Sequence, residues 1–155
     1  MLMTNRGTKS PSLSAGLVGF LGQARPGDYI AIQAYLTPTA DTWSRLQELR
    51  TVLRDRLKVA TTVAYGPRYL HATSQLHMGG PPNGLFLQLT GDDKEDVLIP
   101  GAGYGFATFK AAQALGDLQT LQDAGRRVVR VHLTGKQPQA LEQLIQVVQR
   151  GVRRR

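Results

Sequence analysis

Four short runs of apolar and β-branched residues, separated by segments with a helical pattern, constrain the fold of this chain more than any other feature. The runs lie at residues 29–36, 58–65, 85–90 and 128–133. Strands that alternate with helices at this spacing form a parallel sheet with helices packed on both faces. We therefore predict an α/β fold, a three-layer doubly wound parallel sheet of about four strands.

The helical segments are recognised by apolar residues at spacings of three and four. The clearest one follows Pro38, Thr39 and Asp41, and its apolar residues recur from Trp43 to Leu57. Further helices are predicted at residues 12–21, at 69–77, between the glycine-rich turn at 100–105 and Gly125, and from Pro138 onward. In such a sheet, ligands bind outside the carboxyl ends of the strands.

The length of 155 residues, 41% of them hydrophobic, allows one ordinary core and therefore one domain. We assign residues 12–150 to this domain, residues 1–11 to a flexible leader because they are polar and lack periodicity, and residues 151–155 to a basic tail. The sequence has no cysteine, no run of about 18 apolar residues, and no apolar stretch at its start that would form a signal peptide. These features predict a soluble, cytoplasmic protein that does not enter the membrane.

The net charge of +8 favours anionic partners, either nucleic acid or phosphorylated metabolites. Four arginines fall in the last six residues, where a frayed and solvated tail is the ordinary explanation. The sequence lacks the aromatic motifs and the zinc-finger spacing of known nucleic-acid modules. We therefore expect a phosphorylated metabolite rather than a nucleic acid.

Three polar residues follow predicted strands closely enough to reach one crevice. Asp41 follows the first strand, His71 the second, and Lys110 lies in the first turns of the helix after the third. Together they could supply a proton-abstracting carboxylate, an acid/base for ring opening and a cation for developing negative charge. Each also has an ordinary structural interpretation: a helix-capping acid, a hydrogen-bonded histidine and a solvated lysine.

The glycine-rich turn at residues 101–105 precedes a helix and could present backbone N–H groups to a phosphate, which makes Gly103 and Gly105 candidate binding residues. The turn matches neither the Walker nor the dinucleotide pattern, so a plain tight turn is the alternative. His71 and His77 are six residues apart and do not share a helix face, so we predict no metal.

The segments GPRYLH at 66–71, QLH at 75–77 and GGP at 79–81 form a specific combination, and it is accompanied by further motifs from residue 25 to residue 135. Together these segments resemble the C-terminal half of bifunctional transaldolase/glucose-6-phosphate isomerases. Residues 71–76 also resemble the histidine segment of ordinary glucose-6-phosphate isomerases. The resemblance implies a sugar-isomerase (SIS-like) domain that helps to interconvert glucose 6-phosphate and fructose 6-phosphate without a cofactor.

The resemblance also implies roles for individual residues. It implies that His71 opens the sugar ring, that Lys110 assists, and that Gln75 contacts the substrate. Asp41 lies nearest in spacing to the family's general base, which is a glutamate there. Active sites of the family borrow residues across a dimer, so a homodimer is implied.

Two departures limit what the resemblance implies. The family's phosphate-binding loop comes from an earlier domain that this chain does not encode, and Met78 stands where the bifunctional proteins commonly have a lysine. We therefore expect the C-terminal half of an active unit, completed by an upstream SIS or transaldolase domain or chain. The alternatives are a non-catalytic module for sugar-phosphate binding or subunit interaction, and nucleic-acid binding through the basic tail.

Overall fold

The chain folds around one five-stranded sheet in the order β1-β5-β4-β2-β3, in a computed structural model that describes residues 2–4 and 13–153. Four strands run parallel: β2 (Tyr29–Tyr35), β3 (Ala60–Tyr65), β4 (Gly84–Gly91) and β5 (Arg127–Leu133). The short strand β1 (Leu2–Thr4) pairs antiparallel with β5 at the edge. The predicted parallel sheet of four strands is confirmed.

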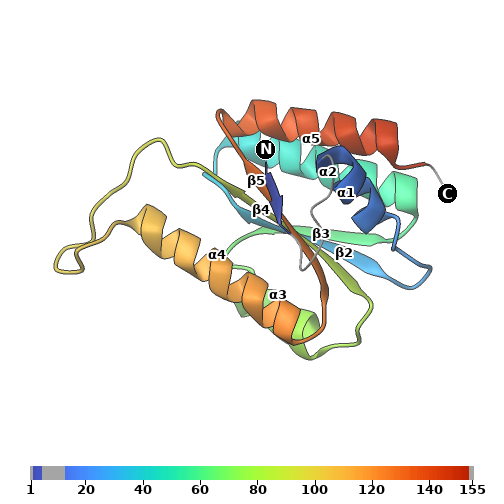
Figure 1. Cartoon of the computed structure of the whole chain (residues 1–155), viewed down its shortest axis with the longest axis horizontal. Coiled ribbons are helices and arrows are strands. Elements are labelled where there is room, and N and C mark those ends of the chain that lie inside the picture. The colour runs from blue at the N-terminus through green and yellow to red at the C-terminus, as the bar shows by residue number, and fades with distance from the viewer. Residues whose placement is uncertain (1, 5–12, 154–155) are drawn as a thin grey trace.

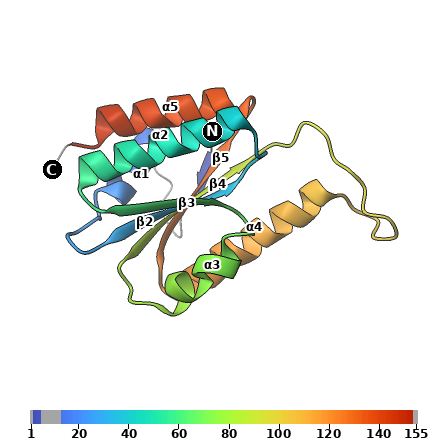
Figure 2. The same ribbon diagram turned by 180° about the vertical axis from the view of Figure 1, so that it is seen from behind.

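Helices cover both faces of this sheet, which confirms the three-layer arrangement (Figure 1, and Figure 2 from behind). One face carries α1 (Leu13–Leu21), α2 (Ala40–Leu57) and α5 (Gln137–Gly151). The other face carries α3 (Leu70–Ser74), the π-helix η1 (Gln75–Gly79) and α4 (Phe106–Asp123).

The face under α1, α2 and α5 holds the main apolar core. Side chains alternate between the two faces along each strand, so every second residue of β2, β4 and β5 points into this core. Fully buried members include Ile30, Leu87 and Val131 from the strands, packed against Leu49 of α2 and Leu144 of α5. Each such side chain contributes about 1.5–3 kcal/mol by leaving water.

The opposite face is apolar only toward the amino ends of its strands. There, Ala31, Phe86 and Val128 pack against Leu118 and Leu121 of α4. Toward the carboxyl ends, the residues that the strand alternation places on this face are polar: Gln33, Tyr35, Gln88, Thr90, Arg130 and His132. This polar half of the face positions the site described below.

Local signals explain where the helices begin and end. The side chain of Thr39 accepts a hydrogen bond from the Thr42 amide and caps α2, which ends at Lys58 in the left-handed conformation with φ of 56°. Pro138 lies in the first turn of α5, where its missing N–H costs nothing.

The ends of the chain differ from the sequence-based expectation. Residues Leu2–Thr4, assigned to a flexible leader, form β1, because their backbone pairs with residues 130–132 of β5. The rest of that leader, residues 1 and 5–11, lies outside the described residues. At the other end, Gly151 belongs to α5, and Val152 is buried with its carbonyl bonded to Arg56 Nη1 at 2.6 Å, so the tail begins after Val152. Residues 154–155 of the tail are outside the described part.

In the part of the chain that the structure describes, no helix combines the length and the apolar character needed to cross a membrane.

Candidate functional site

Loops at the carboxyl ends of β2, β4 and β5 enclose a crevice of about 650 Å³. From β2 the chain moves outward to β3, and then returns across the sheet to β4, so the strand order reverses between β2 and β4. A doubly wound sheet binds its ligands at this switch point. The volume lies within the range of about 300–1,000 Å³ that is usual for ligand sites.

Acidic side chains dominate the lining of this crevice. Four carboxylates and two ammonium groups line it: Asp41, Asp92, Asp93, Glu95, Lys94 and Lys136. Asp41 comes from the first turn of α2 and is exposed to solvent. At the base, the side chain of the buried residue Gln137 accepts from the Thr37 amide and donates to the Asp92 carbonyl, both at 2.9 Å. Gln137 thereby holds the loops after β2 and β4 together.

A smaller pocket of about 150 Å³ lies beside the crevice, between α4 and the carboxyl ends of β4 and β5. The two spaces meet at Asp93, which lines both. Lys110 projects from α4 into the smaller pocket and forms an ion pair with Asp93, Nζ to Oδ1 at 2.5 Å. The crevice therefore has an acidic side and a side that carries cations.

Two further residues of β5, Arg130 and His132, line the smaller pocket. Arg130 donates from Nε to Gln88 Oε1 and from Nη2 to the Ala114 carbonyl, both at 2.6 Å. Burial lowers the pKa of Arg130, because a partly dehydrated guanidinium loses hydration energy. The His132 ring lies 2.9 Å from Thr90 Oγ1 through Nδ1 and 3.1 Å from Asp92 Oδ1 through Nε2.

A tyrosine pair anchors α4 against the sheet beneath this pocket. The hydroxyls of Tyr35 and Tyr69 both donate to Oδ2 of Asp117. Burial is the main cause that raises the pKa of each tyrosine, and the neighbouring carboxylate adds to it. Both tyrosines therefore stay neutral donors, which fixes α4 over the carboxyl ends of the strands.

The structure brings two of the three predicted catalytic residues to this edge of the sheet. Asp41 lines the crevice and Lys110 lines the adjoining pocket. His71 is exposed on α3 and lines neither space, and Gln75 is exposed at the start of η1. The three residues therefore do not form one cluster within a single chain.

The glycine-rich turn, with its candidate binding residues Gly103 and Gly105, leads into α4, where a carboxylate of the chain itself meets the start of the helix. The amide of Ala107 in the first turn of α4 donates to Asp96 Oδ1 at 2.8 Å. A Cβ atom at Gly105 would collide with this same carboxylate, so the glycine makes room for Asp96. Gly103 is an exposed turn residue with φ of 70°. The chain's own carboxylate thus occupies the helix N-terminus that was expected to bind phosphate.

Sequence reasoning missed Asp92, Asp93, Arg130 and His132. Strands buried on both faces of a doubly wound sheet are ordinarily apolar throughout. Polar residues at every second position of β4 and β5 break this pattern, and Gln88 faces Arg130 as Thr90 faces His132 in the register. This alternation of polar and apolar residues in β4 and β5 could have indicated a polar site under α4.

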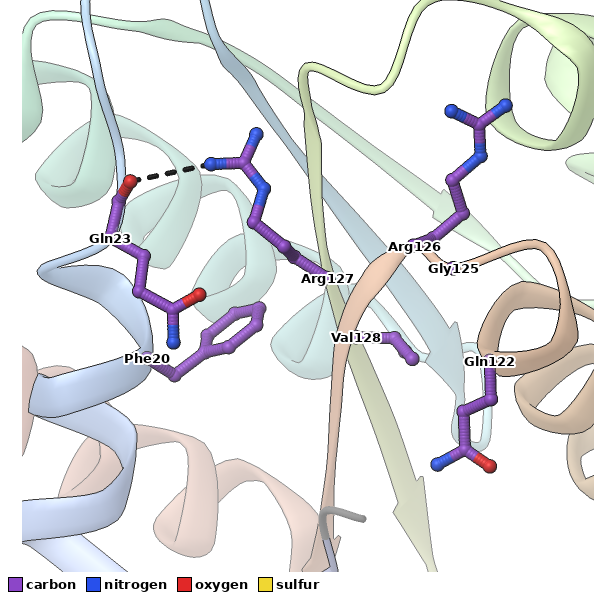
Figure 3. A pocket seen from close by; sticks show the side chains of 7 residues that line it. All are labelled: Phe20, Gln23, Gln122, Gly125, Arg126, Arg127 and Val128. Carbon is purple, nitrogen blue, oxygen red and sulfur yellow. Dashed lines mark hydrogen bonds between the residues drawn. The ribbon is translucent and has the colours of Figure 1, made fainter.

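A third pocket, of about 210 Å³, lies at the amino end of β5 and includes Phe20, Arg126 and Arg127 (Figure 3). Its cations already have protein partners. Arg127 forms a bidentate pair with Asp28 at 2.9 and 3.0 Å, and Arg126 donates to the Met78 and Gly80 carbonyls. These contacts tie segments of the fold together. Among residues 2–4 and 13–153, no group of three side chains is placed to hold a metal ion.

Comparisons with known proteins support the fold. No protein-family model matches the sequence, and a search of curated proteins gives no match. A matching solved structure is that of a hypothetical protein, TT0462, from Thermus thermophilus, with a TM-score of 0.77 and 21% sequence identity. The match covers 91% of this chain and 38% of that chain, so this chain spans well under half the length of the Thermus protein.

Proposed function

We propose that this chain is one half of an aldose–ketose isomerase that interconverts glucose 6-phosphate and fructose 6-phosphate. The observation that carries the proposal is the crevice at the switch point, where an exposed carboxylate, Asp41, lines a space that adjoins the ammonium group of Lys110. Isomerisation through an enediol needs a carboxylate to move a proton and a cation to balance the negative charge that develops. The resemblance of residues 25–135 to glucose-6-phosphate isomerases supports the same assignment.

In the proposed reaction, Asp41 removes the proton from C2 of the aldose and returns it to C1, so no electron leaves the sugar and no cofactor is consumed. A base of this kind must be deprotonated and within reach of the substrate carbon. Asp41 is exposed at the mouth of the crevice, on the rigid first turn of α2. Lys110 is held by Asp93 on the other side.

His71 is proposed to act on the crevice of a second copy. Its exposure on α3, away from the crevice of its own chain, supports this arrangement. The proposed active unit is therefore a homodimer in which each site combines Asp41 and Lys110 of one chain with His71 of the other. A further domain that holds the substrate would complete the unit.

The test follows solvent deuterium entering fructose 6-phosphate by NMR in deuterated water. We expect Asp41→Asn to lower the rate of exchange at least 100-fold, because the proton then has no acceptor. Asp55→Asn is the matched control, since it removes the same charge from an exposed position of the same helix. Full exchange activity in Asp41→Asn would rule out the proposed base.

A second candidate function is subunit interaction, which the outer face of α4 favours. Phe106, Phe109, Ala112 and Leu115 are exposed and three residues apart, so they form one continuous ridge with no charged side chain. Exposed apolar patches of this kind mark interaction surfaces. Association of the chain without any exchange at C2 would favour this function over the isomerase.

A further inference from the structure

The outer side of β3, which we call the open edge, is the edge of the sheet opposite β1, and no strand in the described part of the chain pairs with it. The amide of Gly66, directly after β3, donates to the Ala34 carbonyl of β2 at 2.9 Å. Successive residues of a parallel strand direct their backbone groups to alternate sides. The N–H groups of Thr61, Val63 and Tyr65 therefore point away from β2, to the open edge.

The open edge lacks the features with which proteins usually prevent the addition of a further strand. Such features are charged side chains or proline within the strand, a bulge, or a very short strand. The six residues of β3 include neither a charged residue nor proline, and they pair with β2 without a bulge. By contrast, β1 at the opposite edge has three residues. The open edge is therefore long and regular enough to accept another strand.

One side of α2 runs along the open edge (Figure 2). The residues on this side recur at spacings of three and four: Trp43, Gln47, Arg50 and Arg54. Trp43 stacks on Tyr65 at the carboxyl end of β3, with ring centroids 5.7 Å apart. Near the amino end of β3, the Arg50 carbonyl accepts a hydrogen bond from Thr61 Oγ1 at 3.3 Å. This side of α2 thus forms a wall against which the side chains of an added strand would pack.

Both ends of the open edge are cationic. Arg50 and Lys58 lie at the amino end of β3, and Arg68 follows its carboxyl end. Burial raises the pKa of Tyr65, and the charge of Arg68 opposes this rise, which places Arg68 close to the edge. Within the described part of the chain, these three cations form no ion pair, and Arg50 donates to the neutral side chain of Gln47 at 2.8 Å. A strand with acidic residues at both ends complements this pattern of charge.

A second copy of β3 lacks that complementarity. Two β3 strands paired antiparallel about their centres would bring Lys58 of one chain beside Arg68 of the other, so like charges would meet at both ends. The complementary strand therefore comes from a different protein.

We propose that the open edge of β3 binds an extended segment of another protein, with a β-branched apolar core about as long as β3 and acidic residues at both ends. The main chain of this segment pairs with Thr61 and Val63, and its apolar side chains contact Trp43. The proposal is independent of the isomerase, since none of these residues lines the crevice or the pocket beside it.

Trp43 is the only tryptophan of the chain, so its fluorescence reports binding at this edge. The probe is a synthetic peptide of about ten residues, with two glutamates at each end and alternating valine and threonine between them. We expect a saturable shift of the emission to shorter wavelength, because the added strand covers an indole that is 41% exposed. The same peptide with lysines in place of the glutamates should bind at least about tenfold more weakly. Equal binding of the two peptides would overturn the proposed partner.

Amide hydrogen exchange, followed by NMR, separates strand addition from other modes of binding. The N–H groups of Thr61, Val63 and Tyr65 should exchange at least about tenfold more slowly in the complex, because carbonyls of the peptide then accept them. Those of Thr62 and Ala64 face β2 already and should change little. A peptide with proline at its two central residues should give no protection. A fluorescence change without this alternating protection would contradict strand addition.

Arg50→Gln and Arg68→Gln test the two ends of the open edge. Each should weaken binding of the glutamate peptide about two- to fivefold, and the double variant about tenfold, since exposed charge pairs contribute modestly. Arg45→Gln is the matched control: it removes the same charge from the same helix, but Arg45 is paired with Glu48 and with Glu142 of α5. Its affinity should stay within about 1.5-fold of the unaltered chain. An equal loss in all three single variants would show that net charge alone attracts the peptide, and would overturn the site.

Discussion

His77 is the most buried of the three histidines, whereas the sequence analysis singled out His71 as a candidate site residue. His77 is 3% exposed, and its ring packs between Tyr69 and Phe86, with centroid distances of 5.6 and 5.0 Å. Its Nδ1 atom lies 3.4 Å from Gln33 Nε2, and none of the residues that the structure describes forms a hydrogen bond with its Nε2 atom. Burial lowers the pKa of His77, because the charged ring would lose its hydration.

This burial predicts a loss of stability in mild acid. Below the ordinary histidine pKa of 6.5, the His77 ring is protonated in the unfolded chain but stays neutral in the folded chain until the pH reaches its lowered pKa. The free energy of unfolding should therefore fall by up to about 1.4 kcal/mol per pH unit, from pH 6.5 down to the lowered pKa. Urea unfolding between pH 5 and pH 8 measures it. His77→Leu should flatten this slope, whereas the exposed control His71→Leu should keep it; a slope unchanged by His77→Leu would contradict the account.

Asp117 supports a second prediction at the residue scale. It accepts both tyrosine hydroxyls beneath α4, so Asp117→Ala leaves two buried donors without an acceptor. We expect a loss of about 2–4 kcal/mol in the free energy of unfolding, since each such donor costs about 1–3 kcal/mol. The exposed residue Gln119 of the same helix is the control, and Gln119→Ala should stay within about 0.5 kcal/mol. A loss under 1 kcal/mol for Asp117→Ala would show that water replaces the carboxylate.

Among the elements, α4 contains Gly116 and is preceded by Gly105, and replacing these two glycines by alanine should change stability in opposite directions. Gly116 is exposed in mid-helix with no atom near its missing Cβ, so Gly116→Ala should stabilise the fold by about 0.5–1 kcal/mol. A Cβ at Gly105 would displace Asp96 from the helix N-terminus, and loss of such a cap costs about 1 kcal/mol. Melting temperatures of the two variants measure this. The same sign of change in both would contradict the role given to Asp96.

The elements that the sequence predicted well are those with strong local signals. The strands and long helices begin and end within a few residues of the predicted positions, because capping residues, glycine and proline mark their ends. The strand β1 was missed because three residues carry no periodicity, and its partner in β5 lies more than 120 residues away in the sequence. The π-helix η1 was predicted as ordinary helix, since apolar spacing does not reveal the wider turn.

The residues of the site were also predictable only in part, because some of them are brought together by contacts between segments far apart in the sequence. Asp41 and Lys110 lie in the first turns of helices that follow strands, so the parallel sheet alone places them near its carboxyl edge. Arg130 and His132 lie within a strand, and they reach that edge because β5 pairs with β4 in one particular register. Register depends on long-range contacts that local patterns do not contain.

At the scale of the whole molecule, the two faces of the sheet have different roles. The face under α1, α2 and α5 is an apolar core that gives stability. The face under α4 keeps polar groups at the crevice, and α4 buries Leu118 and Leu121 near its carboxyl end but exposes Phe106, Phe109 and Leu115 near its amino end. The segment between β4 and α4 reaches beyond the body of the domain (Figure 1) and exposes Val97 and Leu98, which are 67% and 72% accessible. Val97 adjoins the start of α4, where its carbonyl accepts a hydrogen bond from the Phe106 amide at 3.0 Å.

This outer surface predicts that two copies associate through α4. The ridge carries no charged side chain, so two chains of net charge +8 can meet there without opposing like charges, and the small side chain of Ala112 lets two helices approach closely. Sedimentation equilibrium should show a dimer that Phe109→Glu converts to a monomer, because the dimer would bury two unpaired carboxylates. Trp43→Glu is the control, since Trp43 is 41% exposed and Phe109 is 43% exposed, but Trp43 stacks on Tyr65 away from α4. A monomer at every concentration would contradict the predicted dimer. It would also contradict the proposal that His71 of one chain acts at the crevice of the other. A dimer that persists in Phe109→Glu would place the interface on another face.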